Sequence, residues 1–91
     1  MMNRLACTEY VADLDAVCNL DLPWNDLKEK TVVVSGATGM IGAFIIDVLM
    51  RKNMTDGLSC NVVALGRSAE KARLRLPYFG ASFFSFEEAS I

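Results

Sequence analysis

The sequence has no histidine, and its three cysteines, Cys7, Cys18 and Cys60, lie far apart without a Cys-x-x-Cys pair. Zinc sites need closely spaced cysteines or histidines, so no metal site is expected, and the cysteines are interpreted as reduced structural thiols. The lack of histidine also removes the commonest general base, which excludes nucleophilic catalysis of the Ser-His or Cys-His type.

Long runs of charge or of apolar residues are absent too. The net charge is −2 and no more than two basic residues are adjacent, so we do not expect nucleic acid as a partner. The longest apolar run, Met40 to Val48, is interrupted by Gly42 and Asp47 and is far shorter than the roughly 20 residues of a membrane span. The first ten residues contain no apolar stretch typical of a secretory signal, so a cytoplasmic location is the default expectation.

Apolar residues, in contrast, are plentiful. They make up 53% of the 91 residues, above the roughly 45–50% usual for a soluble domain. We interpret the excess as apolar surface that further residues would cover, and expect the chain to be the N-terminal fragment of a larger domain. The sequence leaves open whether such a fragment is a natural product.

The hydrophobic pattern predicts alternating helices and strands. A short amphipathic helix is expected over Thr8–Asn19, with Thr8 as its N-cap, followed by a packed lead-in to Lys30. The β-branched run Thr31–Ser35 predicts a first strand covered on both faces, as in a parallel sheet. The remaining predictions are a helix packed on the sheet through Ile41, Phe44, Ile45, Val48 and Leu49, a surface turn over Asn53–Ser59, a strand over Asn61–Leu65, a helix over Ala69–Leu76 with Ser68 as N-cap, and a third strand near Phe83, Phe84 and Phe86.

This order predicts an α/β fold, the N-terminal β-α-β-α-β portion of a Rossmann-type doubly wound parallel sheet, preceded by a short helix. Residues 1–30 form the helix and lead-in, and residues 31–91 form the truncated dinucleotide-binding domain.

A glycine-rich turn joins the first strand to the next helix and reads Gly36-Ala37-Thr38-Gly39-Met40-Ile41-Gly42. Such a turn offers free N–H groups and the positive end of a helix dipole to a pyrophosphate. Gly36 permits the tight turn, Gly39 allows close approach of the cofactor, and Gly42 allows the helix to pack on the strand. The spacing G-x-x-G-x-x-G is one residue longer than the usual G-x-G-x-x-G, and a purely structural glycine turn is the alternative.

The position after the second strand indicates which cofactor is bound. It reads Gly66-Arg67-Ser68 and lacks the acid that usually contacts the adenosine ribose of NAD. Arg67 could pair with a 2′-phosphate and Ser68 could add a hydroxyl, so NADP is favoured over NAD; the alternative is that Arg67 only caps a surface turn.

The segment Val32–Gly42 resembles the opening of the extended short-chain dehydrogenase/reductases, in the NAD-dependent epimerase/dehydratase family that acts on nucleotide sugars. Further likenesses to this family are Leu22-Pro23-Trp24, Ala64-Leu65-Gly66-Arg67-Ser68, Lys71-Ala72-Arg73 and Tyr78-Phe79-Gly80. The resemblance places the pyrophosphate at Gly36, Thr38, Gly39, Met40, Ile41 and Gly42, and the adenosine ribose at Arg67 and Ser68.

The catalytic residues of the family do not carry over. The family uses a Tyr with a Lys four residues later, whereas Tyr10 is followed at that distance by Leu14 and Tyr78 by Ser82. The acid that contacts adenine in the family would lie beyond Ile91, and Glu87 and Glu88 are interpreted as surface charges.

Three hypotheses about function follow. The first is the cofactor-binding portion of an NAD(P)-dependent nucleotide-sugar epimerase or dehydratase, inactive alone, whose parent binds a nucleotide sugar. The second is a non-catalytic dinucleotide-binding or interaction module. The third is a truncated product whose exposed sheet edge pairs with another chain, which gives a homo-oligomer where that chain is a second copy.

Overall fold

The computed structural model describes residue 5, residues 7–37 and residues 39–88. Its elements, in chain order, are α1 (Thr8–Cys18), the 3₁₀ helix η2 (Trp24–Leu27), β1 (Thr31–Val34), α2 (Met40–Asp56), β2 (Asn61–Gly66), α3 (Ala69–Arg75) and β3 (Phe84–Glu88). The alternation of strands and helices after residue 30 confirms the predicted α/β class.

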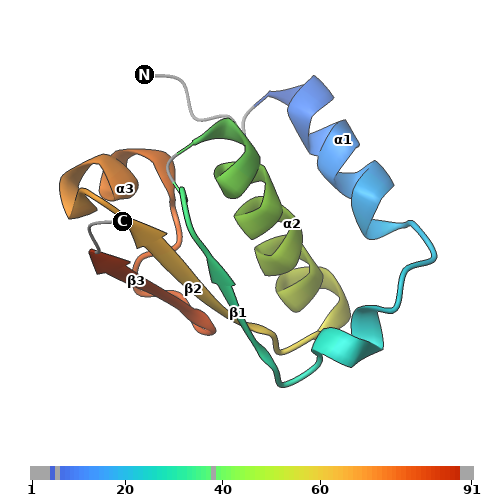
Figure 1. Ribbon diagram of the computed structural model, residues 1–91. Coiled ribbons are helices and arrows are strands. Elements are labelled where there is room, and N and C mark those ends of the chain that lie inside the picture. Colours follow the sequence, from blue (N-terminus) through green and yellow to red (C-terminus); the bar gives the residue numbers. More distant parts are fainter. Residues whose placement is uncertain (1–4, 6, 38, 89–91) are drawn as a thin grey trace.

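The three strands form one parallel sheet in the order β1-β2-β3. Val32 lies opposite Val62 in this sheet, and Val62 lies opposite Phe84. The strands therefore all point the same way, and their carboxyl ends meet at the edge where α2 and α3 begin (Figure 1). This is the arrangement expected for the first half of a Rossmann-like sheet, where ligands bind beyond the carboxyl ends of the strands.

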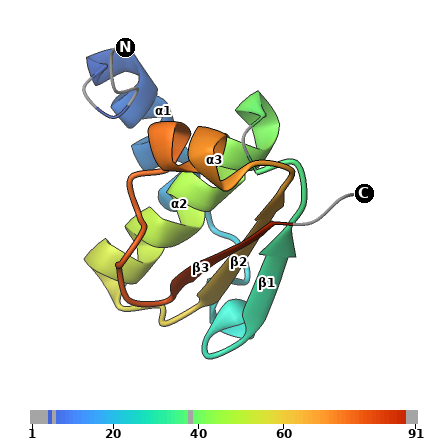
Figure 2. The same ribbon diagram turned by 90° about the vertical axis from the view of Figure 1, so that its left-hand side faces the viewer.

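Helices α2 and α3 cover one face of the sheet, as Figure 2 shows. The core between them contains Val34, Val62 and Ala64 from the strands, Ile46 from α2 and Leu76 just after α3, all at most 6% exposed. Helix α1 lies alongside α2 rather than on the sheet (Figure 1) and buries Leu14.

The opposite face of the sheet is open in the described part of the chain. Val33 is 57% exposed, although its neighbours Val32 and Val34 point into the core face. The predicted covering of the first strand on both faces is therefore wrong for the described residues, because both helices of the β-α-β-α-β portion lie on the same side.

Only part of the predicted face of α2 is buried: Val48 and Leu49 are buried as predicted, but the start of the helix differs. Ile41 is 77% exposed and Ile45 42%, whereas Ala43, Ile46 and Met50 are buried. The helix begins at Met40 directly after the tight turn. Apolar residues at helical spacing occupy two overlapping sides of this helix, so spacing alone could not show which side packs on the sheet.

Two element boundaries differ from the prediction. The helix after the glycine turn continues to Asp56, so the surface turn begins only at Gly57, whose φ of 64° provides a left-handed C-cap. Thr8 is the first residue of α1 rather than its N-cap; Cys7 holds that position without a side-chain hydrogen bond. Ser68, in contrast, is the N-cap of α3 as predicted, since its Oγ accepts the N–H of Lys71 at 3.2 Å.

Candidate functional site: the carboxyl edge of the sheet

The glycine turn lies between β1 and α2 and is held by backbone hydrogen bonds. The N–H of Gly39 donates to the carbonyl of Gly36 at 2.9 Å, and the N–H of Ala43 donates to the carbonyl of Gly39 at 2.9 Å. The N–H of Ala37 crosses to the carbonyl of Leu65 in β2 at 3.1 Å. This last contact fixes the turn beside the end of β2, two residues before Arg67.

Two of the three glycines are required by the backbone itself. Gly36 has a φ of +66°, in the left-handed region that favours glycine. At Gly42 an added Cβ would lie 2.3 Å from the carbonyl oxygen of Gly36, which is too close for any side chain. The predicted roles of Gly36 in the tight turn and of Gly42 in close packing are therefore matched by the geometry.

Gly39 is the N-cap of α2, and a side chain at this position would be in tight contact with the turn without being excluded. An added Cβ would lie 3.3 Å from the carbonyl oxygen of Gly36. No described side chain caps α2, so the first N–H groups of the helix point outward without an intrahelical partner. Its first residue, Met40, is 87% exposed and Ile41 is 77% exposed, so the described side chains leave this helix end accessible. Thr38, the remaining predicted pyrophosphate residue, lies outside the described residues.

The predicted ribose residues lie at the same edge. Arg67 is exposed directly after β2, and Ser68 is half-buried with its Oγ engaged by the N–H of Lys71. The structure thus brings the predicted pyrophosphate and ribose residues to one edge of the sheet, joined by the Ala37–Leu65 hydrogen bond.

One residue at this edge makes a contact that the sequence did not predict. Glu88 is exposed, as predicted for a surface charge, and it ends β3, where it lies opposite Gly66 of β2. Its Oε2 accepts the backbone N–H of Ala69, the first residue of α3, at 3.0 Å. The position of Glu88 beside the start of α3 follows from the pairing of β2 with β3. The sequence alone does not show that pairing.

Both tyrosines lie in a buried polar cluster rather than at the glycine turn. The hydroxyl of Tyr10 donates to Oδ2 of Asp47 at 2.6 Å, and the hydroxyl of Tyr78 donates to Oδ1 at 2.5 Å. Asp47 is 1% exposed. No local sequence pattern indicates this cluster, which connects α1, α2 and the segment after α3.

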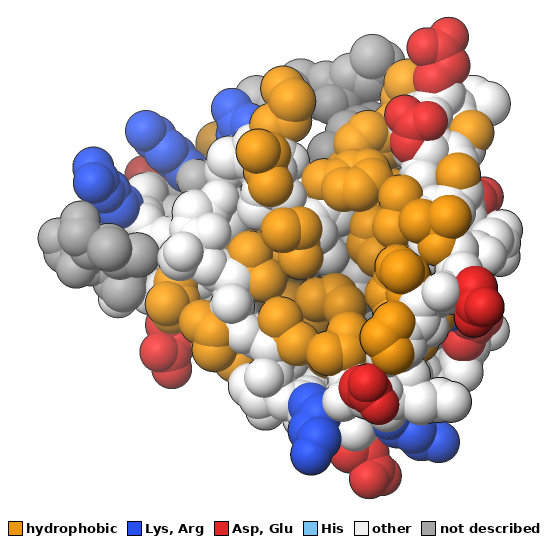
Figure 3. Space-filling view, turned by 45° about the vertical axis from the view of Figure 1, so that its right-hand side comes forward, with side chains coloured by type: hydrophobic (Ala, Val, Ile, Leu, Met, Phe, Trp, Pro, Cys, Tyr) orange, Lys and Arg blue, Asp and Glu red, His pale blue; other side chains and the backbone are white. Residues whose placement is uncertain are grey.

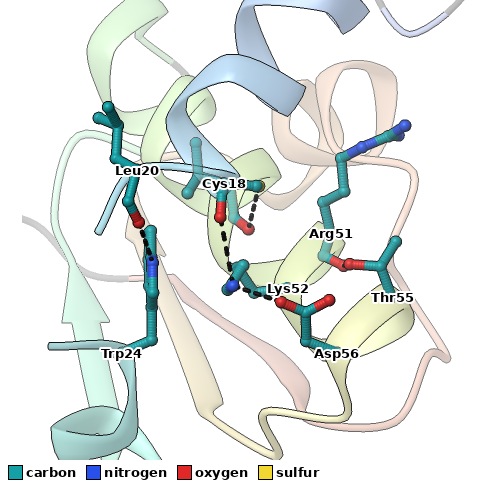
Figure 4. A network of polar contacts seen from close by, with 8 residues as sticks. Cys18, Leu20, Trp24, Arg51, Lys52, Thr55 and Asp56 are labelled. Atoms are coloured by element: carbon teal, nitrogen blue, oxygen red, sulfur yellow. Dashed lines mark hydrogen bonds and ion pairs between the residues drawn. The ribbon is translucent and has the colours of Figure 1, made fainter. Parts of the chain in front are cut away.

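A second polar network attaches the lead-in to the far end of α2 (Figure 4). Lys52, 6% exposed, donates through Nζ to the carbonyl of Cys18 at 3.3 Å and to the carboxylate of Asp56, and lies over the Trp24 ring at 4.7 Å. The hydrogen bond from Lys52 lowers the pKa of Asp56. Burial raises the pKa of the Cys18 and Cys60 thiols, which agrees with their interpretation as unreactive structural cysteines.

Hollows in the surface of the described residues lie away from the glycine turn. One of about 270 Å³ is lined by Trp24, Lys52 and Asp56 among others, and one of about 480 Å³ lies between α2 and the segment after α3, beside Met54 and Tyr78.

Among the described residues there is no group of three or more potential metal-ligating side chains. None of the described helices is both long enough and apolar enough to cross a membrane.

The fold and the turn define a Rossmann-like α/β half-sheet with a glycine-rich strand-to-helix connection. The chain is similar to part of an aldehyde reductase from Aspergillus flavus, with 33% identity over 72 residues. That match covers 79% of this chain but only 7% of the length of the fungal protein. No family model and no solved structure matches the chain. The similarity agrees with the resemblance to reductases of the short-chain type at this coarse level.

Proposed function

We propose that this chain is the cofactor-binding portion of an NAD(P)-dependent oxidoreductase. The observation that carries the proposal is the turn from Gly36 to Gly42. Gly36 has a left-handed φ, Gly42 has no space for a side chain, and the outward N–H groups of α2 lie at the carboxyl edge of a parallel sheet. The similarity to an aldehyde reductase supports redox chemistry.

The residues fit a dinucleotide in a definite arrangement. The pyrophosphate would lie on the N–H groups that open α2, at Gly39, Met40, Ile41 and Gly42, with Gly36 and Thr38 completing the turn. The adenosine would extend toward Arg67 and Ser68 at the end of β2. Bound there, the nicotinamide cofactor supplies hydride chemistry, while this chain binds and orients it.

The finer proposal is a reductase, epimerase or dehydratase acting on a nucleotide sugar. It rests on the resemblance of Val32–Gly42 and Ala64–Ser68 to that family. The aldehyde reductase supports a carbonyl substrate in general and does not favour a sugar. Because the hydroxyls of Tyr10 and Tyr78 both donate to Asp47, we expect the 91 residues to bind cofactor without catalysing turnover.

A charge placed at the start of α2 tests the proposal. Met40→Glu adds a carboxylate where the pyrophosphate would lie, at an exposed position where an acid stabilises the helix. Met54→Glu adds the same charge near the other end of α2, at a residue that is 77% exposed. Calorimetric titration with NAD and with NADP should show binding to the unaltered chain, weakened about tenfold by Met40→Glu and little changed by Met54→Glu.

A folded chain that binds neither dinucleotide would overturn the proposal, as would equal weakening by the two variants. Circular dichroism establishes that each variant is folded. The alternative of a non-catalytic binding module predicts the same titrations but no turnover in any longer protein that carries this chain. A steady-state assay of such a protein with a carbonyl substrate separates the two.

A further inference from the structure

The end of β3 places an acidic side chain at the proposed adenosine end of the site. Gly66 ends β2 without a side chain, and Glu88 lies opposite it in the parallel register. An acid at the end of the second strand commonly accepts hydrogen bonds from the ribose of NAD. This chain has no acid there, but the neighbouring strand supplies one in the adjacent position.

The Glu88 side chain is turned toward the β2–α3 connection. Its Oε2 accepts the N–H of Ala69 at 3.0 Å, and Ala69 follows Arg67 and Ser68 directly. Figure 1 shows the ends of β2 and β3 at the same corner of the molecule as α3. Glu87, the preceding residue, lies opposite Leu65 and so points to the other face of the sheet. Only one of the two adjacent acids therefore faces this connection.

We propose that Glu88 determines cofactor choice, accepting a hydrogen bond from the adenosine ribose and repelling a 2′-phosphate, so that the chain selects NAD over NADP. The inference rests on the proposed function and deepens it. It opposes the preference for NADP drawn from Arg67, because a phosphate paired with Arg67 and Ser68 would lie beside the carboxylate bound to Ala69. Two like charges at such a distance repel each other even near a protein surface.

The carboxylate has acceptor capacity for both contacts. One oxygen accepts the Ala69 N–H, and an ionised carboxylate offers about four acceptor positions in all. A ribose hydroxyl can donate to it, whereas a 2′-phosphate is mostly a dianion at neutral pH and is repelled by the carboxylate. Ser68 Oγ accepts the N–H of Lys71 and keeps its O–H to donate to a phosphate, but one neutral donor does not offset the repulsion between two like charges.

The matched variants are Glu88→Gln and Glu87→Gln. Glutamine at position 88 keeps a side-chain oxygen that can accept the Ala69 N–H, so the start of α3 is retained while the charge is removed. The second variant removes the same charge from the opposite face of the same strand. Both residues are exposed, so both variants should fold.

The measurement is the ratio of the dissociation constants of NADP and NAD for the complete chain, by calorimetry at low salt. We expect the unaltered chain to bind NAD about tenfold more tightly than NADP, Glu88→Gln to reduce that ratio about tenfold, and Glu87→Gln to change it less than twofold. A residue that only capped α3 would alter stability and leave the ratio unchanged.

An unchanged ratio in Glu88→Gln, or a preference for NADP in the unaltered chain, would overturn the inference and leave the proposed function standing. Equal shifts in the two variants would also overturn it, since they would reflect net charge alone. If the folded chain bound neither NAD nor NADP, the proposed function would fail and the inference would fail with it.

Discussion

At the scale of single residues, the glycines of the turn are required for different physical reasons, although they are equivalent in the sequence motif. Gly36 has open space around the position of a Cβ but a φ of +66°, so a side chain there meets only the conformational cost of the left-handed region. Gly42 has a helical backbone, but a side chain would meet the carbonyl group of Gly36 and the Cα of Ala37. One glycine is required for its backbone angle and the other for its closeness to the turn.

This difference predicts unequal effects of alanine at the two positions. Gly36→Ala should lower the free energy of unfolding by about 1–2 kcal/mol, the cost of a left-handed alanine. Gly42→Ala should cost about 3 kcal/mol or more, because the backbone of the turn must move to admit a Cβ. Urea denaturation followed by circular dichroism measures both values, and Gly57→Ala, with a φ of +64° and open space, is the control for Gly36→Ala. Equal costs at positions 36 and 42 would contradict the close packing of α2 on the turn.

At the scale of elements, the Asp47 cluster connects parts of the chain that are distant in sequence. A buried carboxylate is costly unless it is hydrogen-bonded, and here Tyr10 of α1 and Tyr78 after α3 both donate to it. Helix α2 is thereby linked to α1 on one side and to the segment that leads to β3 on the other. Tyr10 also packs edge-to-face on Phe44 of α2, and Tyr78 packs on Phe84 of β3.

The cluster predicts that the two tyrosine hydroxyls differ in their contribution to stability. Tyr78 is 8% exposed, so in Tyr78→Phe no water can easily replace the lost donor, and we expect a loss of about 1–3 kcal/mol. Tyr10 is half-buried, so water can reach Asp47 in Tyr10→Phe and the loss should stay below about 1 kcal/mol. Thermal denaturation of the two variants and of the double variant gives the coupling between them. A larger loss for Tyr10→Phe would contradict this account.

The sequence predicted the elements better than the contacts between them. The β-branched run Thr31–Val34, the strand at Asn61 and the Ser68 cap depend on neighbouring residues, and each appears as predicted within a residue or two. The exposed face of α2 and the position of Glu88 depend on how helix and strands pair, which no local pattern contains. Asp47 looked like an interruption of an apolar run because its tyrosine donors lie 37 and 31 residues away.

At the scale of the whole molecule, helices cover apolar side chains on one face of the sheet, while other apolar side chains of the described residues stay exposed. Helices α2 and α3 cover one face of the sheet, and the described residues leave large apolar side chains exposed elsewhere, among them Val33, Met40, Ile41 and Ile45. Figure 3, which turns forward the side where α1 and α2 lie, shows hydrophobic side chains gathered over the centre of the face and charged ones at its margin. Large exposed apolar areas rimmed by polar groups are typical of interaction surfaces.

We therefore expect the chain to associate with itself as its concentration rises. Ile41 and Ile45 are one helical turn apart on the exposed side of α2, so replacing both with lysine places two charges within this apolar surface without entering the core. Sedimentation velocity over a range of concentrations should show a dimer for the unaltered chain and at least a tenfold higher dissociation constant for Ile41→Lys/Ile45→Lys. Leu74→Lys, at a residue of α3 that is 71% exposed, adds charge elsewhere and should leave association nearly unchanged.

A chain that stays monomeric at every concentration would show that this apolar surface is too small or too uneven to hold a second copy. A dimer equally weakened by Leu74→Lys would place the contact elsewhere or show that net charge alone controls it.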